Sequence, residues 1–157
     1  MDFIDGIKTR QLNFNCDERG RLMELFRQDW PEFNKFGQVY LTTAYPGVIK
    51  GWHYHKIQTD NICCVKGMIK VVLYDDRKDS RSYKKLDEFF IGEYNQILIS
   101  IPHGIYHGWK CISGVEAIVI NIPNKPYNRK TPDEYRLPPT TNKIPYKWVL
   151  TPGKKHG

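Results

Sequence analysis

Short runs of β-branched, aromatic and aliphatic residues recur along the chain, and each run ends at a glycine, a proline or a polar turn. The runs occupy residues 38–45, 61–67, 68–76, 88–93, 96–102 and 115–123. With the histidine-bearing strand described below, about seven strands at roughly ten-residue spacing predict an all-β sandwich or barrel. Residues 21–33 allow one short helical turn, because Leu22, Leu25 and Phe26 share a helical face.

The chain has 157 residues, a length that suits one domain with its own core. We expect a single domain over residues 1–157 whose core covers about 14–123. The segment 124–157 contains many prolines, which favour an extended chain that runs over the barrel as a tail.

Composition narrows the class of protein. No apolar run approaches the roughly 20 residues of a membrane helix, and the first residues lack the apolar centre of a signal peptide, so we expect a cytoplasmic protein.

The four cysteines show no C-x-x-C spacing, and we expect free thiols, with adjacent Cys63 and Cys64 facing opposite sides of a strand. The formal net charge of +7 is spread along the chain, whereas nucleic-acid binders more often carry a basic stripe. A diffuse excess suits steering of a small polyanion equally well, so charge alone does not decide the partner.

The stretch "KGWHYHKIQTD" (residues 50–60) carries candidate chemistry. His53 and His55 lie two residues apart on a predicted strand, so both side chains point to one face. A second strand leads to Pro102, a turn at Gly104 and then His107. Two such strands would bring the three histidines together inside a small barrel. Each histidine alone is read as a packed polar residue, but the set favours a functional site.

The motifs around these histidines resemble those of a known family. "GWHYHKIQTDNICCVKG" and "GEYNQILISIPHGIYHG" resemble the paired motifs of the cupin superfamily. More narrowly, "DERGRLMELFR", "QVYLTTAYPGVIKGWHYH", "VVLYDDRKDSRSY", "IPHGIYHGW" and "PYNRKTPDE" follow in the order found in the dTDP-4-dehydrorhamnose 3,5-epimerase family. The chain is similar to a divergent member of that family over residues 16–148.

This resemblance implies a cupin-type jelly roll that acts on a 4-keto-6-deoxy sugar linked to a nucleoside diphosphate, such as a dTDP-sugar. A C–H bond beside a ketone is acidic because its carbanion is delocalised as an enolate, so a histidine can remove the proton. The family requires no metal and no organic cofactor. The implied partners are the nucleotide sugar and a second copy of the chain in a homodimer; neither a nucleic acid nor a membrane is implied.

The family's roles fall on particular residues. His53 matches the base, His107 matches a second active-site histidine, and Lys50 stands where the family has an arginine. Arg19 and Glu24 match a nucleotide-binding segment that reaches into the neighbouring subunit. Gln38 and Arg77 fall on positions with nucleotide or structural contacts in the family. Beyond the family pattern, we expect His55, Asp60 and Trp109 to contact the substrate as well.

Several departures limit what carries over. Ile120 or Asn121 stands at the place of the family's proton-donating tyrosine, and we expect Tyr127 to take over proton return. The family's catalytic lysine falls near Asp60 or Asn61. The stretch with the base-orienting aspartate is replaced by "TTNKIPYKW" (residues 140–148).

Asp60 has three readings. It could complete a metal site with His53, His55 and His107 for Fe(II), Mn(II), Ni(II) or Zn(II), it could orient one of the first two histidines, or it could be a solvated turn residue. A metal-dependent cupin enzyme and a non-catalytic nucleotide-sugar-binding module are therefore the alternative functions.

Other positions also keep two readings. Trp52 and Trp109 either stack on a ligand or pack in the core. Arg77 is either a phosphate contact or part of a hairpin salt bridge, and Arg19 is either a diphosphate ligand or the partner of a neighbouring acid. The run "PDEYRLP" (residues 132–138) is read as a structural tail packed on the barrel.

Overall fold

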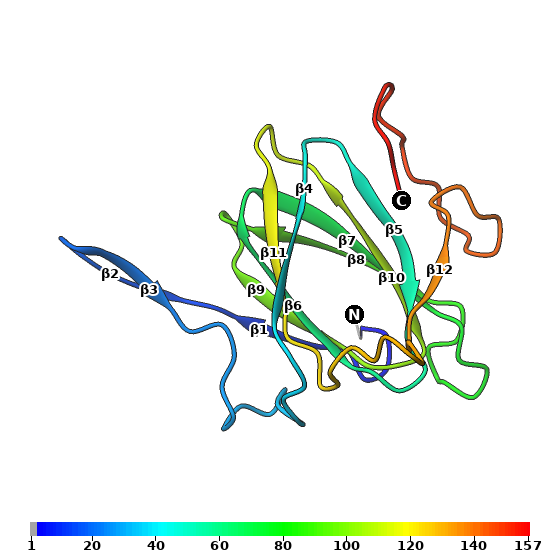
Figure 1. Cartoon of the computed structure of the whole chain (residues 1–157), viewed down its shortest axis with the longest axis horizontal. Coiled ribbons are helices and arrows are strands. Elements are labelled where there is room, and N and C mark those ends of the chain that lie inside the picture. The colour runs from blue at the N-terminus through cyan, green and yellow to red at the C-terminus, as the bar shows by residue number, and fades with distance from the viewer. Residues whose placement is uncertain (1–2) are drawn as a thin grey trace.

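A computed structural model describes residues 3–157 and shows two five-stranded antiparallel sheets packed face to face, with a separate two-stranded hairpin (Figure 1). The first sheet has the order β1 (Lys8–Gln11), β9 (Ile97–Ile101), β6 (Asp60–Lys66), β11 (Ala117–Asn121) and β4 (Tyr40–Ala44). The second has the order β12 (Tyr135–Leu137), β5 (Ile49–Tyr54), β10 (Ile105–Cys111), β7 (Met68–Asp75) and β8 (Leu86–Gly92). The hairpin consists of β2 (Phe14–Asp17) and β3 (Gly20–Met23).

The main core lies between the two sheets and follows from alternation along the strands. On β7, Ile69, Val71 and Leu73 point into this core, whereas Val72 and Tyr74 belong to a second cluster on the outer face. The adjacent cysteines behave in the same way, because Cys64 lies in the inner core and Cys63 in an outer cluster. The prediction that they face opposite sides is confirmed.

The C-terminal segment covers the outer face of the second sheet. Trp52 is fully buried there among Ile144 and Trp148, and β12 pairs with β5 as the edge strand. Strand β1 is thus part of the first sheet and strand β12 part of the second, although both lie outside residues 14–123. The boundaries of the core and the tail within one domain stay a prediction.

The predicted helical turn at residues 21–33 is wrong. No helix occurs within residues 3–157: this segment begins as strand β3 and continues through turns. The reason is tertiary packing, since Leu25, Phe26 and Trp30 lie against Leu12 and Leu98 on the outer face of the first sheet. The apolar side chains of Leu25 and Phe26, which suggested a helical face, instead cover a sheet. It follows that no helix of the described chain is long and apolar enough to cross a membrane.

Candidate active site

A cavity of about 810 Å³ opens between the two sheets and collects most of the predicted site residues. Strands from both sheets contribute side chains, and the C-terminal segment closes part of the rim. From the strands and the turn after β5 come Tyr40, Thr42, Lys50, His53, His55, Asp60, His107, Trp109 and Asn121. From the rim come Gln38, Tyr127, Asp133, Glu134 and Arg136, among others.

A β-bulge on β5 brings Lys50 and His53 to the same face. In a regular strand, residues three apart point to opposite sides of the sheet. Here His107 and Trp109 on β10, two residues apart, pair with His53 and Lys50, three residues apart, so β5 holds one extra residue. Lys50 and His53 therefore both line the cavity, while Trp52 turns to the outer cluster.

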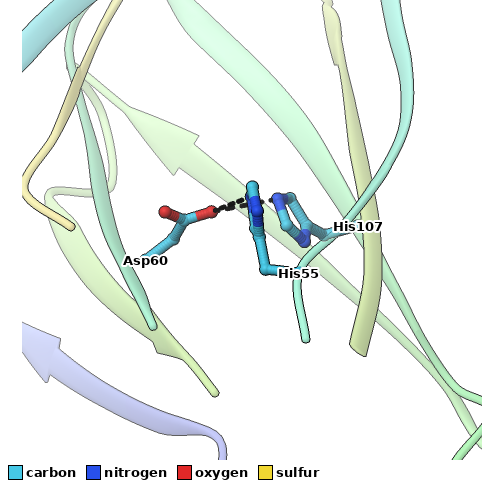
Figure 2. A group of neighbouring side chains, drawn as sticks. All are labelled: His55, Asp60 and His107. Atoms are coloured by element: carbon cyan, nitrogen blue, oxygen red, sulfur yellow. Dashed lines mark ion pairs between the residues drawn. The ribbon is translucent and has the colours of Figure 1, made fainter. Parts of the chain in front are cut away.

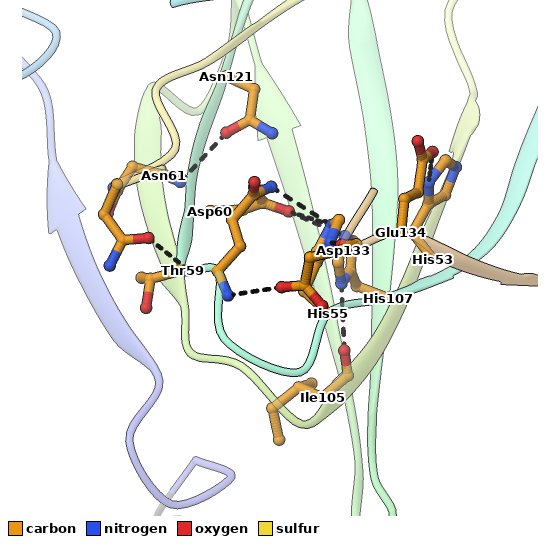
Figure 3. A network of polar contacts seen from close by, with 12 residues as sticks. His53, His55, Thr59, Asp60, Asn61, Ile105, His107, Asn121, Asp133 and Glu134 are labelled. Carbon is orange, nitrogen blue, oxygen red and sulfur yellow. Dashed lines mark hydrogen bonds and ion pairs between the residues drawn. The ribbon is translucent and has the colours of Figure 1, made fainter. Parts of the chain in front are cut away.

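His53 has a carboxylate partner that the sequence analysis did not identify. Its Nδ1 lies 3.4 Å from Glu134 Oε1 (Figure 3). The same carboxylate accepts hydrogen bonds from Arg136. Burial lowers the pKa of His53, and Glu134 offsets this only in part, so the imidazole is uncharged at neutral pH. The hydrogen bond with His53, with help from Arg136 and against the effect of burial, lowers the pKa of Glu134 to about 2. A neutral histidine held by an ionised carboxylate is suited to accept a proton.

Asp60 faces the rings of the other two histidines, and one of its carboxylate oxygens contacts both (Figure 2). Its Oδ2 is 3.2 Å from His55 Nε2 and 3.2 Å from His107 Nε2, and Gln58 Nε2 donates to its Oδ1 at 2.8 Å. Only 1% of Asp60 is exposed, so the reading as a solvated turn residue is wrong. Burial would raise the pKa of Asp60, but the hydrogen bonds from His107 and His55 lower it far below its usual range. Burial opposes a charge on His55, yet Asp60 outweighs it and raises the pKa of that ring.

The outer nitrogens of these two rings fix their tautomers. His55 Nδ1 donates to the backbone oxygen of Asp133, and His107 Nδ1 donates to the backbone oxygen of Ile105 at 3.2 Å. Each Nε2 therefore faces the Asp60 carboxylate with either a proton or a bare lone pair. In the second case three acceptor atoms converge, an arrangement that a bound cation or a shared proton would stabilise.

The same trio meets the requirements of a metal site. One ligand atom from each of His55, Asp60 and His107 lies within 4.8 Å of the others. Histidine ligands generally donate their second ring N–H to a carbonyl or carboxylate, as both rings do here. His53 is outside this group, because its Nδ1 faces Glu134. The structure thus brings together three of the four ligands considered from the sequence.

Three predicted site residues lie away from the cavity of their own chain. Arg19 pairs with Asp17 at 2.5 Å on the β2–β3 hairpin, which extends away from both sheets (Figure 1). Glu24 pairs with Arg27 at 2.5 Å just beyond that hairpin. Arg77 forms the salt bridge with buried Asp75, at 2.9 Å, that the hairpin reading anticipated. None of the three lines the cavity.

The remaining predicted residues lie at the cavity wall or rim. Lys50 Nζ is 5.8 Å from the ring centre of Trp109 and bonds Thr42 Oγ1 at 2.8 Å. Gln38 Oε1 accepts the backbone N–H of Tyr127 at 3.1 Å, and the Tyr127 residue is 51% exposed at the rim. Tyr127 is therefore an edge residue, while Trp109 is a buried wall residue.

Residues 132–138 pack on the barrel, as the sequence reading has it, and Asp133 and Glu134 of this segment also line the cavity. The Asp133 carboxylate accepts the backbone N–H groups of Lys56, Ile57 and Gln58, and Glu134 holds His53. The strand register explains this placement. Arg136 on β12 pairs with His53 on β5, and Glu134, two residues before Arg136, points to the same side of the sheet as Arg136 and can therefore reach His53. Two adjacent acids before a strand-like run were the available signal, but no local pattern reveals a pairing with a strand some eighty residues earlier.

An antiparallel two-sheet fold with a cavity between the sheets is that of a cupin-like jelly roll. The chain belongs to the dTDP-4-dehydrorhamnose 3,5-epimerase family, whose model matches residues 3–155. The family predicted from the sequence motifs is thereby confirmed, and this is a family of nucleotide-sugar epimerases.

Individual relatives agree with this placement. The chain is 43% identical over 140 residues to the probable low-salt glycan biosynthesis epimerase Agl13 of Haloferax volcanii, covering 88% of this chain and 90% of that protein. It is 38% identical over 145 residues to the spore coat polysaccharide biosynthesis protein SpsL of Bacillus subtilis, covering 92% and 96%. A dTDP sugar isomerase from Desulfovibrio desulfuricans superposes with a TM-score of 0.87 at 28% identity over 92% of each chain. The all-β jelly-roll prediction is confirmed by this likeness.

Proposed function

We propose that the chain is an epimerase that acts on a 4-keto-6-deoxy sugar linked to a nucleoside diphosphate, with His53 as the base. The observation that carries the proposal is the contact between His53 Nδ1 and Glu134 Oε1 inside the cavity. A deoxysugar bound to dTDP is the substrate class that the family description supports. Polysaccharide synthesis in the cytoplasm is the corresponding setting, in keeping with the names of Agl13 and SpsL.

The reaction begins with proton removal next to the ketone. His53 takes the proton, and the electrons of the broken C–H bond move into the C–C–O system to form an enolate. The imidazolium that results is stabilised by Glu134, which carries a full charge at neutral pH. No redox change occurs, and the carbon regains its hydrogen from the opposite face.

Lys50 is the cation that we assign to the enolate oxygen. Its ammonium group bonds the neutral hydroxyl of Thr42 rather than a carboxylate, so its charge remains available to an anion in the cavity. Burial lowers the pKa of Lys50, as expected for a cation in a partly dry site. The buried ring of Trp109 below it offers a flat apolar wall for a sugar.

A homodimer is part of the proposal, with the β2–β3 hairpin of each chain reaching towards the nucleotide site of its partner. The hairpin extends beyond both sheets, and Arg19 at its tip is exposed and distant from its own cavity (Figure 1). The edge strand β4 and the segment before it also expose Val39 and Leu41, each 57% accessible. Arg19 and Glu24 would then contact the nucleotide, with Gln38 and Tyr127 at the rim.

The test is proton exchange in D2O with dTDP-4-keto-6-deoxyglucose, followed by NMR at C3 and C5. We expect deuterium to appear at one or both carbons, and His53→Asn to abolish exchange while the melting temperature stays close to that of the parent chain. A wild-type chain that exchanges no 4-keto nucleotide sugar, under conditions where another family member does, refutes the proposal. A nucleotide-induced rise in melting temperature without exchange would instead identify a binding module.

A metal-dependent activity is the second candidate, and the convergence of His55, Asp60 and His107 favours it. These three residues would hold a divalent cation, which would supply a Lewis acid beside the sugar. Metal analysis of protein kept from chelators separates the two functions. Less than about one-tenth of an ion per chain excludes the metal function, because ligand sets of this kind bind tightly.

A further inference from the structure

The wall of the cavity opposite His53 carries a proton donor that the sequence analysis did not identify. His53 belongs to β5 of one sheet, whereas β4, β6 and β11 of the other sheet supply the facing side chains. Inversion at carbon requires removal of a proton from one face of the planar enolate and delivery to the other face. A donor on the opposing sheet is therefore in the right place for the second step.

Tyr40 occupies that wall next to Asn121. The two residues are direct partners across β4 and β11, and Tyr40 is among the cavity-lining residues. Asn121 Nδ2 donates to Tyr40 Oη at 2.8 Å. Asn121 is one of the two residues, with Ile120, that the resemblance places at the position of the family's proton-donating tyrosine. Strand β4 thus places the Tyr40 phenol beside the position on β11 where this chain has no tyrosine.

The hydrogen bonds of Asn121 fix the direction in which Tyr40 can donate. The backbone N–H of Asn61, which can only donate, meets Asn121 Oδ1 at 3.2 Å (Figure 3). The amide nitrogen must therefore face Tyr40, whose oxygen accepts and whose own hydrogen stays free. Within residues 3–157, no acceptor is bonded to this phenolic hydrogen.

The phenol also has a suitable protonation state. Burial, together with the negative charges of Asp60 and Glu134, raises the pKa of Tyr40 to about 12, so it carries its proton at neutral pH. Asn121 Nδ2 is already placed to stabilise the phenolate that forms when the proton leaves. Tyr40 and Tyr127 differ little in exposure, at 41% and 51%, but Tyr127 has only its backbone N–H bonded, to Gln38.

We propose that Tyr40 is the catalytic residue that donates a proton to the enolate carbon on the face opposite His53. This assignment rests on the proposed epimerase function. The O–H bond of Tyr40 breaks, its proton bonds to the carbon, and the enolate electrons form the new C–H bond as the ketone is restored. Solvent at the cavity mouth then reprotonates the phenolate and takes the proton from His53.

The test is Tyr40→Phe in the full chain, with two readouts on the same dTDP-4-keto sugar. Solvent deuterium exchange should continue, because His53 still removes a proton and returns a deuteron on its own face. Formation of the inverted sugar should fall about 100-fold or more, the usual contribution of a general acid. Tyr94→Phe, a matched change at a residue that is 91% exposed, should leave both rates unchanged.

Each other outcome counts against the assignment. Inversion at the parental rate in Tyr40→Phe overturns it, as does loss of inversion in Tyr127→Phe alone. If Tyr40→Phe lost both deuterium exchange and inversion while dTDP binding and the melting temperature stayed intact, Tyr40 would be a residue that positions the substrate and not the proton donor. An absence of exchange in the wild-type chain removes the epimerase function and this assignment with it, so the two failures are distinguishable.

Discussion

Glu134→Gln is the substitution that most directly tests how the base is held. The change keeps the size and a hydrogen-bond acceptor but removes the negative charge 3.4 Å from His53 Nδ1. The charge matters only after His53 has accepted a proton, because burial keeps the ring neutral beforehand. The expected loss is therefore in kcat, with KM little changed.

The size of the loss follows from the geometry. A hydrogen bond to a charged group is generally worth about 1.5–3 kcal/mol. Here the 3.4 Å separation is long and Glu134 Oε1 is shared with Arg136, which argues for the lower limit. A loss of about 1.5 kcal/mol corresponds to roughly a tenfold lower kcat.

The assay is steady-state inversion of the dTDP-4-keto sugar, with deuterium exchange measured in parallel. Both rates should fall together in Glu134→Gln, and Glu134→Asp should restore part of kcat because it restores the charge. Glu116→Gln, in the loop before β11, is the matched control for loss of one carboxylate and should leave kcat unchanged. An unchanged kcat in Glu134→Gln, or a loss confined to KM, would refute the orienting role of Glu134.

Two further predictions concern stability and the partner subunit. Asp75→Asn should lower the free energy of unfolding at pH 7 by about 3 kcal/mol in urea titrations, because it leaves Arg77 beside a buried uncharged group. Burial raises the pKa of Asp75, but the hydrogen bonds from Arg77, Ser80 and Ser82 outweigh burial and depress that pKa. The Asp75 carboxylate therefore stabilises the fold at pH values above its ordinary pKa of 3.8, and this stabilisation disappears as the pH falls. If Asp75→Asn lowered the free energy of unfolding as much in acid as at pH 7, the prediction would be contradicted. Arg19→Ala should raise KM for the nucleotide sugar without changing the melting temperature, since an exposed pair contributes about 0–1 kcal/mol. An unchanged KM, or a monomer by light scattering, would count against exchange of the hairpin between subunits.

Strands β4 to β9 and β11 were predictable from the sequence because each carries its own local signal, whereas β1, β2, β3, β10 and β12 were not predicted. On β7, alternation assigns Ile69 and Val71 to one face and Val72 to the other without reference to any distant residue. The shared face of His53 and His55 followed from the same rule. In contrast, the helical turn at residues 21–33 failed because a local apolar pattern cannot tell a helix from a segment that covers a sheet.

The partners of the histidines were less accessible, because they depend on register between distant strands. The bulge that turns Lys50 towards His53 exists only in the pairing of β5 with β10. Glu134 reaches His53 only through the pairing of β12 with β5, and Tyr40 meets Asn121 only through β4 and β11. Chain spacing predicts that residues share a face of one strand, but it does not predict which residues face them across a cavity.

His53 on β5 and His55 in the turn that follows it lie in opposite electrostatic settings, and this difference gives the site its polarity. His53 loses charge to burial and keeps one shared carboxylate as its partner, so it is ready to accept a proton. His55, two residues on, faces the buried Asp60, which favours its charged form. In the proposed function, a neutral histidine on β5 removes the proton and the Lys50 ammonium, bonded to a hydroxyl and to no carboxylate within residues 3–157, holds the enolate. The protonated phenol of Tyr40 on the opposing sheet returns a proton from the other face. Asp60 binds the Nε2 atoms of both His55 and His107, so these two rings are engaged with a carboxylate and His53 is the histidine that we propose as the base.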